Sequence, residues 1–238
     1  MNAVEQGQGY ETAFGALRQF VRRKRDRDVE RCELCAAEVG SEHPHLIEPA
    51  SRKLLCTCNA CAILFSGMGM KYKRVPRRVL ALADFHLSDG QWEGLMVPIS
   101  MAFFYRSTPD KRVVAFYPSP AGATESMLPL ETWNEIEDAN AVLRDMEPDV
   151  EALLANRVGH ARGVAAPEYY VLPIDECYKL VGLIRAHWKG LSGGTEVWQE
   201  IGQFFGGLKQ RATIVTTTGT MTSATTSGEK PAREEANA

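Results

Sequence analysis

The sequence predicts an α+β fold in four parts: an N-terminal helix, a treble-clef-like knuckle rich in cysteine, antiparallel strands, and a mainly helical C-terminal part. Three observations predict it. Apolar residues recur at helical spacing within residues 1–31, and two Cys-x-x-Cys pairs fall within 32–78. Strand-like runs then precede helical periodicity in the α+β body, residues 79–211. A Thr- and Ser-rich tail, 212–238, is expected to be disordered, because it has little apolar surface to bury.

The first part, residues 1–31, is predicted to be a basic helix. Its apolar residues recur at spacings of three and four, which places them on one face; they are Phe14, Leu17, Phe20 and Val21. Residues 1–78 hold 14 basic and 9 acidic side chains, a charge of +5, whereas the rest hold 13 and 21, a charge of −8. An anionic partner would therefore bind the first third. Acidic residues such as Asp26 and Asp28 interrupt the basic run, which argues against nucleic acid as that partner.

The strongest chemical signal is a pair of Cys-x-x-Cys motifs, Cys32/Cys35 and Cys58/Cys61, separated by 22 residues. A turn between two cysteines three positions apart can point both sulfur atoms at one ion, and two such pairs complete a tetrahedral Cys₄ site. A short strand-like run precedes the second pair, and Ala62–Phe65 suits the start of a helix. The motif predicts a metal site with zinc as the metal and these four cysteines as its ligands.

Several alternatives remain open within the same block. Cys56 could replace Cys58, or His45 could join the site. Iron at the same four thiolates would make a rubredoxin-like electron carrier. A divergent HNH-like nuclease would use His45, between the two pairs, to activate water. Against the nuclease, Asn59 is not at the motif's Asn position, and the helix expected after it carries no His.

Residues 79–117 favour strands. The segments Met96–Tyr105 and Arg112–Tyr117 are rich in aromatic and β-branched residues, and Ser107–Lys111 between them supplies hairpin residues. The small, polar segment Ser119–Ser126 fits a tight crossover better than a ligand-binding loop, although a small-molecule site in 118–126 stays open.

Beyond Pro120 the periodicity predicts mainly helices, with caps at Thr132 and Asp175. The expected helices are Leu130–Leu143, one from Pro148 to Asn156, one from Asp175 to Trp188, and Val197–Leu208; Tyr169–Leu172 is the expected strand. Cys177 lies on an apolar helical face and is interpreted as a small core residue. His160 and His187 have no partner at ligand spacing.

The chain resembles an uncharacterised bacterial domain family whose members are similar to proteins encoded beside actinobacterial-type NiFe-hydrogenase genes. The resemblance covers about residues 14–211. Besides both Cys pairs, it rests on His45-Leu46, Leu64-Phe65, Ala115–Ser126, Pro148–Leu154, Pro173–Tyr178 and Trp188–Gly194. It implies a hydrogenase-linked accessory role, with a hydrogenase subunit or maturation factor as the partner.

Taken together, these features predict a metal-binding accessory or adaptor protein that acts by docking to another protein, rather than an enzyme. No segment reaches the roughly 18–20 consecutive apolar residues of a membrane helix. The N-terminus lacks the pattern of a signal peptide. We therefore expect a cytoplasmic protein, in which reduced cysteines favour metal ligation over disulfides.

Overall fold

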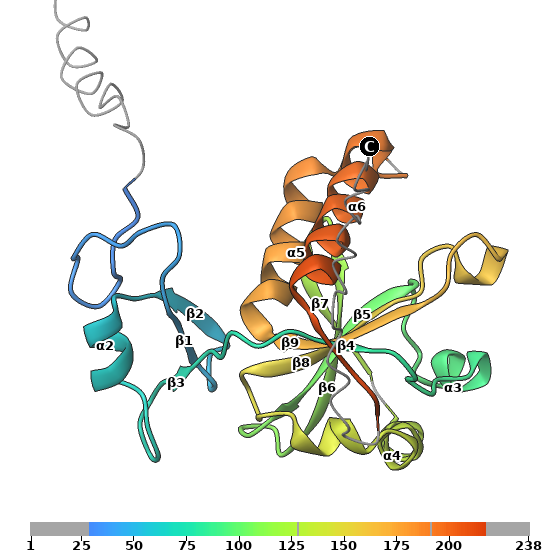
Figure 1. The fold of residues 1–238 in the computed structure, drawn as a ribbon, viewed down its shortest axis with the longest axis horizontal. Coiled ribbons are helices and arrows are strands. Elements are labelled where there is room, and N and C mark those ends of the chain that lie inside the picture. The colour runs from blue at the N-terminus through green and yellow to red at the C-terminus, as the bar shows by residue number, and fades with distance from the viewer. Residues whose placement is uncertain (1–28, 128, 191, 218–238) are drawn as a thin grey trace, which may run out of the picture.

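The computed structural model describes residues 29–217 except 128 and 191 (Figure 1). The predicted basic helix therefore lies almost entirely outside the described residues. The described chain forms two sheets, one of three strands and one of seven. We call residues 31–74, which hold the smaller sheet, the cysteine module, and the rest of the described chain the body.

The cysteine module contains a hairpin, a short helix and a third strand; these are β1 His45–Glu48, β2 Lys53–Cys56, α2 Asn59–Leu64 and β3 Lys73–Arg74. The body's strands are β4 Leu80–Leu82, β5 Met101–Ser107, β6 Arg112–Ser119, β7 Gly122–Ser126, β8 Glu151–Asn156, β9 Glu168–Pro173 and β10 Thr213–Val215. Its α-helices are α3 Asp89–Gly94, α4 Leu130–Ala139, α5 Ile174–His187 and α6 Gly194–Arg211. Two 3-10 helices cover Ala141–Asp145 and His160–Arg162.

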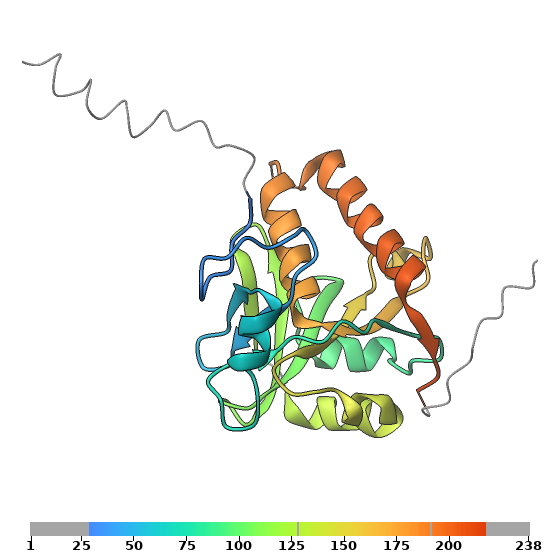
Figure 2. The ribbon, with the colours of Figure 1, turned by 60° about the vertical axis from the view of Figure 1, so that its left-hand side comes forward.

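The larger sheet has the order β10-β4-β9-β8-β5-β6-β7, and all its neighbours pair antiparallel except β10 with β4. Successive strand residues point to opposite faces. Phe103 accordingly packs with the core under α5 and α6, whereas Phe104 packs with Trp133 of α4 on the other face. The body is thus a sheet covered by helices on both sides, and Figures 1 and 2 show α5 and α6 together on one of them.

The prediction of a mainly helical C-terminal part is wrong. Four of the seven strands of the larger sheet begin after Pro120, and β8 occupies the place of the helix expected from Pro148 to Asn156. The cause is burial on both faces. β8 pairs with β5 and β9 and is buried from Glu151 to Ala155, so its sequence shows no alternation of apolar and polar residues. Pairing with two neighbours overrides the helical preference of Ala and Leu.

Several predicted elements are present with different boundaries or caps. The hairpin at Ser107–Lys111 is confirmed by the antiparallel pairing of β5 with β6. The helices α4 and α5 have Pro129 and Pro173 as their N-cap residues, so the predicted caps Thr132 and Asp175 lie inside the first turn instead. Proline suits such a position because the missing N–H would have no partner there.

The segment after residue 212 also differs from its expectation. Thr213–Val215 forms β10, whose Val215 is buried, and the Thr217 backbone N–H donates to Asp84 Oδ1 at 2.6 Å. The first residues of the expected tail therefore close the edge of the larger sheet beside β4. Residues 218–238 lie outside the described part of the chain.

One face of the β1–β2 hairpin packs against the body. Leu46 and Leu55, directly opposite each other, form the module's own small core with Ala62. On the other face, Ile47 is buried in the main core and Leu54 packs against it. The module is therefore joined to the body by apolar burial, and α2 lies on its far side (Figure 1).

Ion pairs also join the two parts. Arg52 contacts Asp110 at 2.8 Å and Glu125 at 2.9 Å, and its guanidinium lies 4.9 Å from the centre of the Phe116 ring. Lys73 contacts the buried Asp149 at 2.7 Å. The basic first third of the sequence thus binds acidic groups of its own chain.

Candidate metal centre

The cysteine module brings the four predicted ligands together through two local turns. Cys32 begins a turn in which the Ala36 N–H donates to the Cys32 carbonyl at 2.8 Å, and Ala36 has a φ of 62°. Cys58 caps α2, and its sulfur accepts a hydrogen bond from the Cys61 N–H at 3.4 Å. Glycine is common directly after a Cys-x-x-Cys pair because it adopts a positive φ easily. Here alanine adopts that conformation instead.

The four sulfur atoms have the spacing of one tetrahedral site. All of them lie within 4.8 Å of one another. Cys35 Sγ and Cys58 Sγ are 3.7 Å apart. Two sulfurs on a tetrahedral zinc ion would be about 3.8 Å apart, given a Zn–S distance of about 2.3 Å. This tetracysteine group could therefore bind a metal ion.

The thiols of the group differ strongly in acidity. Burial raises the pKa of Cys32, but hydrogen bonds from the backbone of Cys58, Leu34 and Cys35 bring it down to about 6. Burial and the neighbouring thiols raise the pKa of Cys61 to about 12. Four thiolates this close repel one another, so a cation is needed before all four lose their protons.

The remaining cysteines, Cys56 and Cys177, lie outside the tetracysteine group. Cys177 of α5 is fully buried in the main core, and burial raises its thiol pKa, so its interpretation as a core residue is confirmed. Cys56 lies on the body-facing side of the hairpin and groups with two histidines, His43 and His45. The structure therefore places Cys56 and His45 in a second cluster rather than in the tetracysteine group.

His45, the residue considered for a nuclease, lies between Asp175 and His43. Its Nδ1 lies 2.6 Å from Asp175 Oδ2, and its Nε2 lies 3.2 Å from His43 Nε2. Asn59 is the first residue of α2, which carries no histidine. The pairing with Asp175 could not be predicted, because the two residues are 130 positions apart in the sequence.

A group of exposed apolar side chains on the module was also missed by sequence reasoning. Ile63 and Leu64 of α2 are 67% and 68% exposed, and Met68 is fully exposed. We call this group, with the half-exposed Phe65 and Met70, the α2 patch. The available signal was an apolar run in a helix too short to bury it, since α2 buries only Cys61 and Ala62.

The small, polar segment after β6 forms a hairpin and not a crossover. β7 pairs with β6 from Ser119 to Ser126, and the turn borders an apolar cavity of about 410 Å³. Trp188 and Trp198 also line this cavity.

The two other histidines considered in the sequence, His160 and His187, lie outside both clusters of metal-ligating residues. His160 Nε2 is 3.2 Å from Asp89, and His187 Nδ1 is 3.0 Å from the Leu183 carbonyl.

No helix in the described residues is both long and apolar enough to cross a membrane.

Comparison with the curated proteins and with the solved structures finds no match. A family model described as "Family of unknown function (DUF5947)" matches residues 31–212, which include both Cys pairs and nearly all of the body. The resemblance to an uncharacterised domain family is thereby confirmed, and the chain belongs to this family of unknown function.

Proposed function

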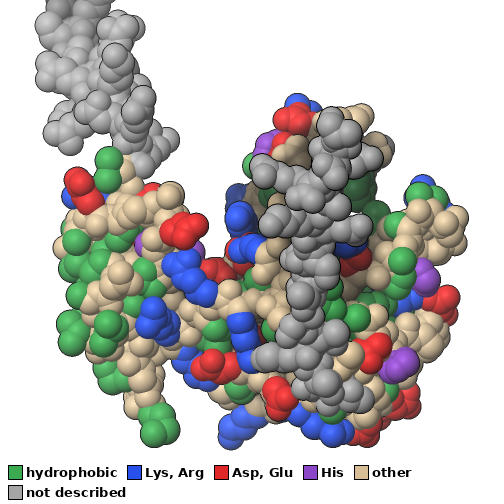
Figure 3. Space-filling view, in the orientation of Figure 1, with side chains coloured by type: hydrophobic (Ala, Val, Ile, Leu, Met, Phe, Trp, Pro, Cys, Tyr) green, Lys and Arg blue, Asp and Glu red, His purple; other side chains and the backbone are tan. Residues whose placement is uncertain are grey.

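We propose that the protein is a zinc-binding adaptor that docks to a partner protein through its cysteine module. The observation that carries the proposal is the α2 patch: five apolar side chains lie on or just after a short helix that carries Cys61. Figure 3 shows apolar side chains gathered on this face of the module, away from the body. A cluster of exposed apolar residues on a folded surface typically marks a binding site.

The tetracysteine group would make this surface rigid. α2 has only six residues, and isolated helices of that length are not stable in water. A metal ion bound to Cys58 and Cys61 would fix the start of the helix, while Ala62 anchors it to Leu46 and Leu55. Metal binding would thereby fix the side chains of the α2 patch for a partner.

The partner implied by the resemblance is a hydrogenase subunit or a hydrogenase maturation factor. An apolar patch would match an apolar surface on that protein, and burying it would contribute roughly 25 cal/mol per Å². Ion pairs within the chain support a protein partner over nucleic acid, because Arg52, Lys73 and Arg78 are already bound to acidic groups.

Changing Leu64 and Met68 together to Glu is expected to reduce recovery of the partner at least about tenfold without unfolding the protein, because both side chains are exposed. The measurement is affinity purification from the native host, with hydrogenase components quantified by mass spectrometry. Val164→Glu, at a position 77% exposed in the body, is the matched control. Recovery of the same partner by the double variant would contradict the proposal, and so would the repeated absence of any hydrogenase component.

Protein purified without added metal is expected to contain zinc and to be colourless, since zinc has a filled d shell. Metal analysis together with a visible spectrum checks this. A red protein with iron bound at the four cysteines would instead support a rubredoxin-like electron carrier.

A further inference from the structure

A second group of metal-ligating side chains lies between the cysteine module and the body. His43, His45 and Cys56 each offer a ligand atom, and these atoms lie within 4.8 Å of one another. We propose that these three residues form a second zinc site, separate from the tetracysteine group and open to the neighbouring cavity. The proposal does not depend on the docking function.

The hairpin register places the three side chains together. His45 lies directly opposite Cys56 in the β1–β2 pairing. Directly opposite residues project to the same face of a sheet, and so do residues two apart along an extended chain. His43, two positions before His45, therefore joins the same cluster, while Leu46 and Leu55 point to the other face.

Hydrogen bonds fix both histidines with one nitrogen free for a metal. His43 Nδ1 lies 2.8 Å from the Gly40 carbonyl oxygen, and His45 Nδ1 lies 2.6 Å from Asp175 Oδ2. These oxygens accept hydrogen bonds, so each Nδ1 carries a proton and donates it. Metal-binding histidines typically make this second contact to a carbonyl or carboxylate oxygen.

The free nitrogens then face each other. The two Nε2 atoms are 3.2 Å apart, and in the neutral rings each presents a lone pair to the other. A cation bound by both nitrogens would remove this repulsion. Two histidine nitrogens on a tetrahedral zinc ion would be about 3.3 Å apart, given Zn–N distances of about 2.0–2.1 Å. The spacing therefore suits a shared metal ion, with the Cys56 thiolate as third ligand.

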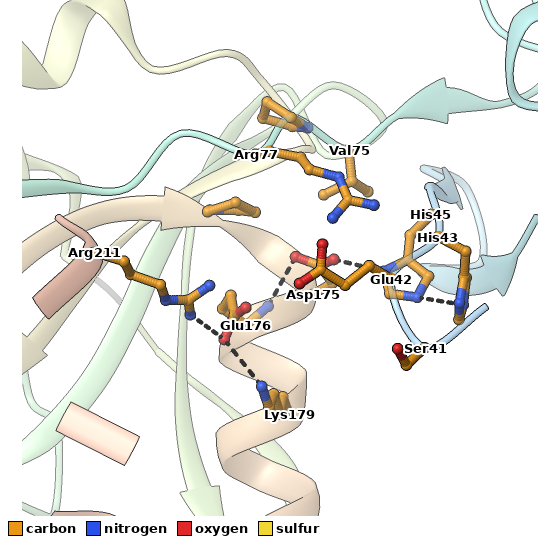
Figure 4. A pocket seen from close by; sticks show the side chains of 12 residues that line it. Ser41, Glu42, His43, His45, Val75, Arg77, Asp175, Glu176, Lys179 and Arg211 are labelled. Atoms are coloured by element: carbon orange, nitrogen blue, oxygen red, sulfur yellow. Dashed lines mark hydrogen bonds and ion pairs between the residues drawn. The ribbon is translucent and has the colours of Figure 1, made fainter. Parts of the chain in front are cut away.

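The fourth position would be open. His43 and His45 line a cavity of about 380 Å³ between module and body (Figure 4). Asp175 lies beside them, and Arg77 also lines the cavity and has no ion-pair partner among the described residues. Three protein ligands beside a cavity are the arrangement in which zinc keeps a water molecule or a small anion as its fourth ligand.

The test measures metal stoichiometry and affinity in the full chain. Wild-type protein loaded with zinc and freed of excess metal is expected to hold two ions per chain, and the double variant His43→Gln, His45→Gln one. Asp175 is a positioning residue, so Asp175→Asn is expected to keep both sites but weaken the second about 10- to 100-fold. His86→Gln, an exposed histidine outside the cluster, is the matched control.

Cobalt(II) substitution identifies which site is lost. The histidine double variant and Cys56→Ser are each expected to remove or alter one set of visible bands and to leave the tetrathiolate bands unchanged. Both variants are expected to keep the circular dichroism spectrum of the folded wild-type protein. One metal ion per chain in the wild type, or two retained in the folded double variant, would overturn the proposal. Neither result depends on a docking partner, so this proposal can fail while the adaptor proposal stands.

Discussion

Replacing Cys61 with Ser is expected to release the metal from the tetracysteine group and to unfold most of residues 31–74, while the seven-stranded sheet stays folded. Cys61 is buried, and its sulfur lies within 4.8 Å of the other three. Losing one of four thiolates leaves an incomplete site. Structural zinc contributes roughly 10–16 kcal/mol to the folding of small zinc domains, so most of the module's stability would be lost.

The module has little else to hold it. Its own core consists of Leu46, Leu55 and Ala62. Two buried leucines contribute roughly 1.5–3 kcal/mol each, whereas ordering the backbone costs roughly 1–2 kcal/mol for every residue. Ile47 and Leu54 add contacts with the body, so the hairpin strands are expected to be the part of the module that opens least.

Limited proteolysis with mass spectrometry checks this result, because new cleavage should fall between residues 31 and 74 in the variant and in wild-type protein treated with a chelator. Cys177→Ala, which truncates a core cysteine of α5, is the control; it should keep its metal and lose only about 1 kcal/mol. A Cys61→Ser protein with the wild-type cleavage pattern would show that the module folds without the metal.

The cysteine module could be predicted from sequence because its signals are local. Each Cys-x-x-Cys pair is a single turn, and the short strand and helix around the second pair lie next to it in the chain. The strands β5 and β6 were predicted for the same reason, since their hairpin turn lies between two aromatic and β-branched runs. The tetracysteine group needs only that these two turns meet across one hairpin.

Features that depend on distant partners could not be predicted. The sequence of β8 alone predicts a helix, because the strand is stabilised by pairing with β5 and β9, which lie elsewhere in the sequence. The charge of +5 on residues 1–78, against −8 on the rest of the sequence, suggested an external anionic partner, but Lys73 binds Asp149 of the same chain. Likewise, the grouping of His45 with Cys56 depends on the strand register, and its contact with Asp175 joins positions far apart in the sequence.

Replacing Arg78 with Met is expected to destabilise the body by about 3–5 kcal/mol, because it leaves a buried carboxylate without its charged partner. The Glu151 side chain in β8 is only 1% exposed. Arg78 binds it through Nε and through Nη2, the latter at 2.6 Å from Oε2, and the Glu147 N–H donates to the same oxygen at 2.9 Å. The backbone bond alone would then have to stabilise the charge.

The size of the effect follows from burial and not from the ion pair as such. Arg144→Met breaks an ion pair with Asp138, at 2.6 Å, in which both side chains are at least half exposed. Such pairs contribute about 0–1 kcal/mol, so this variant is the matched control. Removing both partners in Arg78→Met, Glu151→Leu should recover most of the loss, because no buried charge remains.

Urea unfolding followed by the fluorescence of the tryptophans, including the buried Trp133 of α4, measures all three variants. The single Arg78 variant should lower the unfolding midpoint with little change in slope, which would report a loss of stability and not a change in the surface exposed on unfolding. A loss below about 1 kcal/mol, equal to that of the surface control, would mean that water reaches Glu151 and that the ion pair does not hold β8 to the segment leaving the cysteine module.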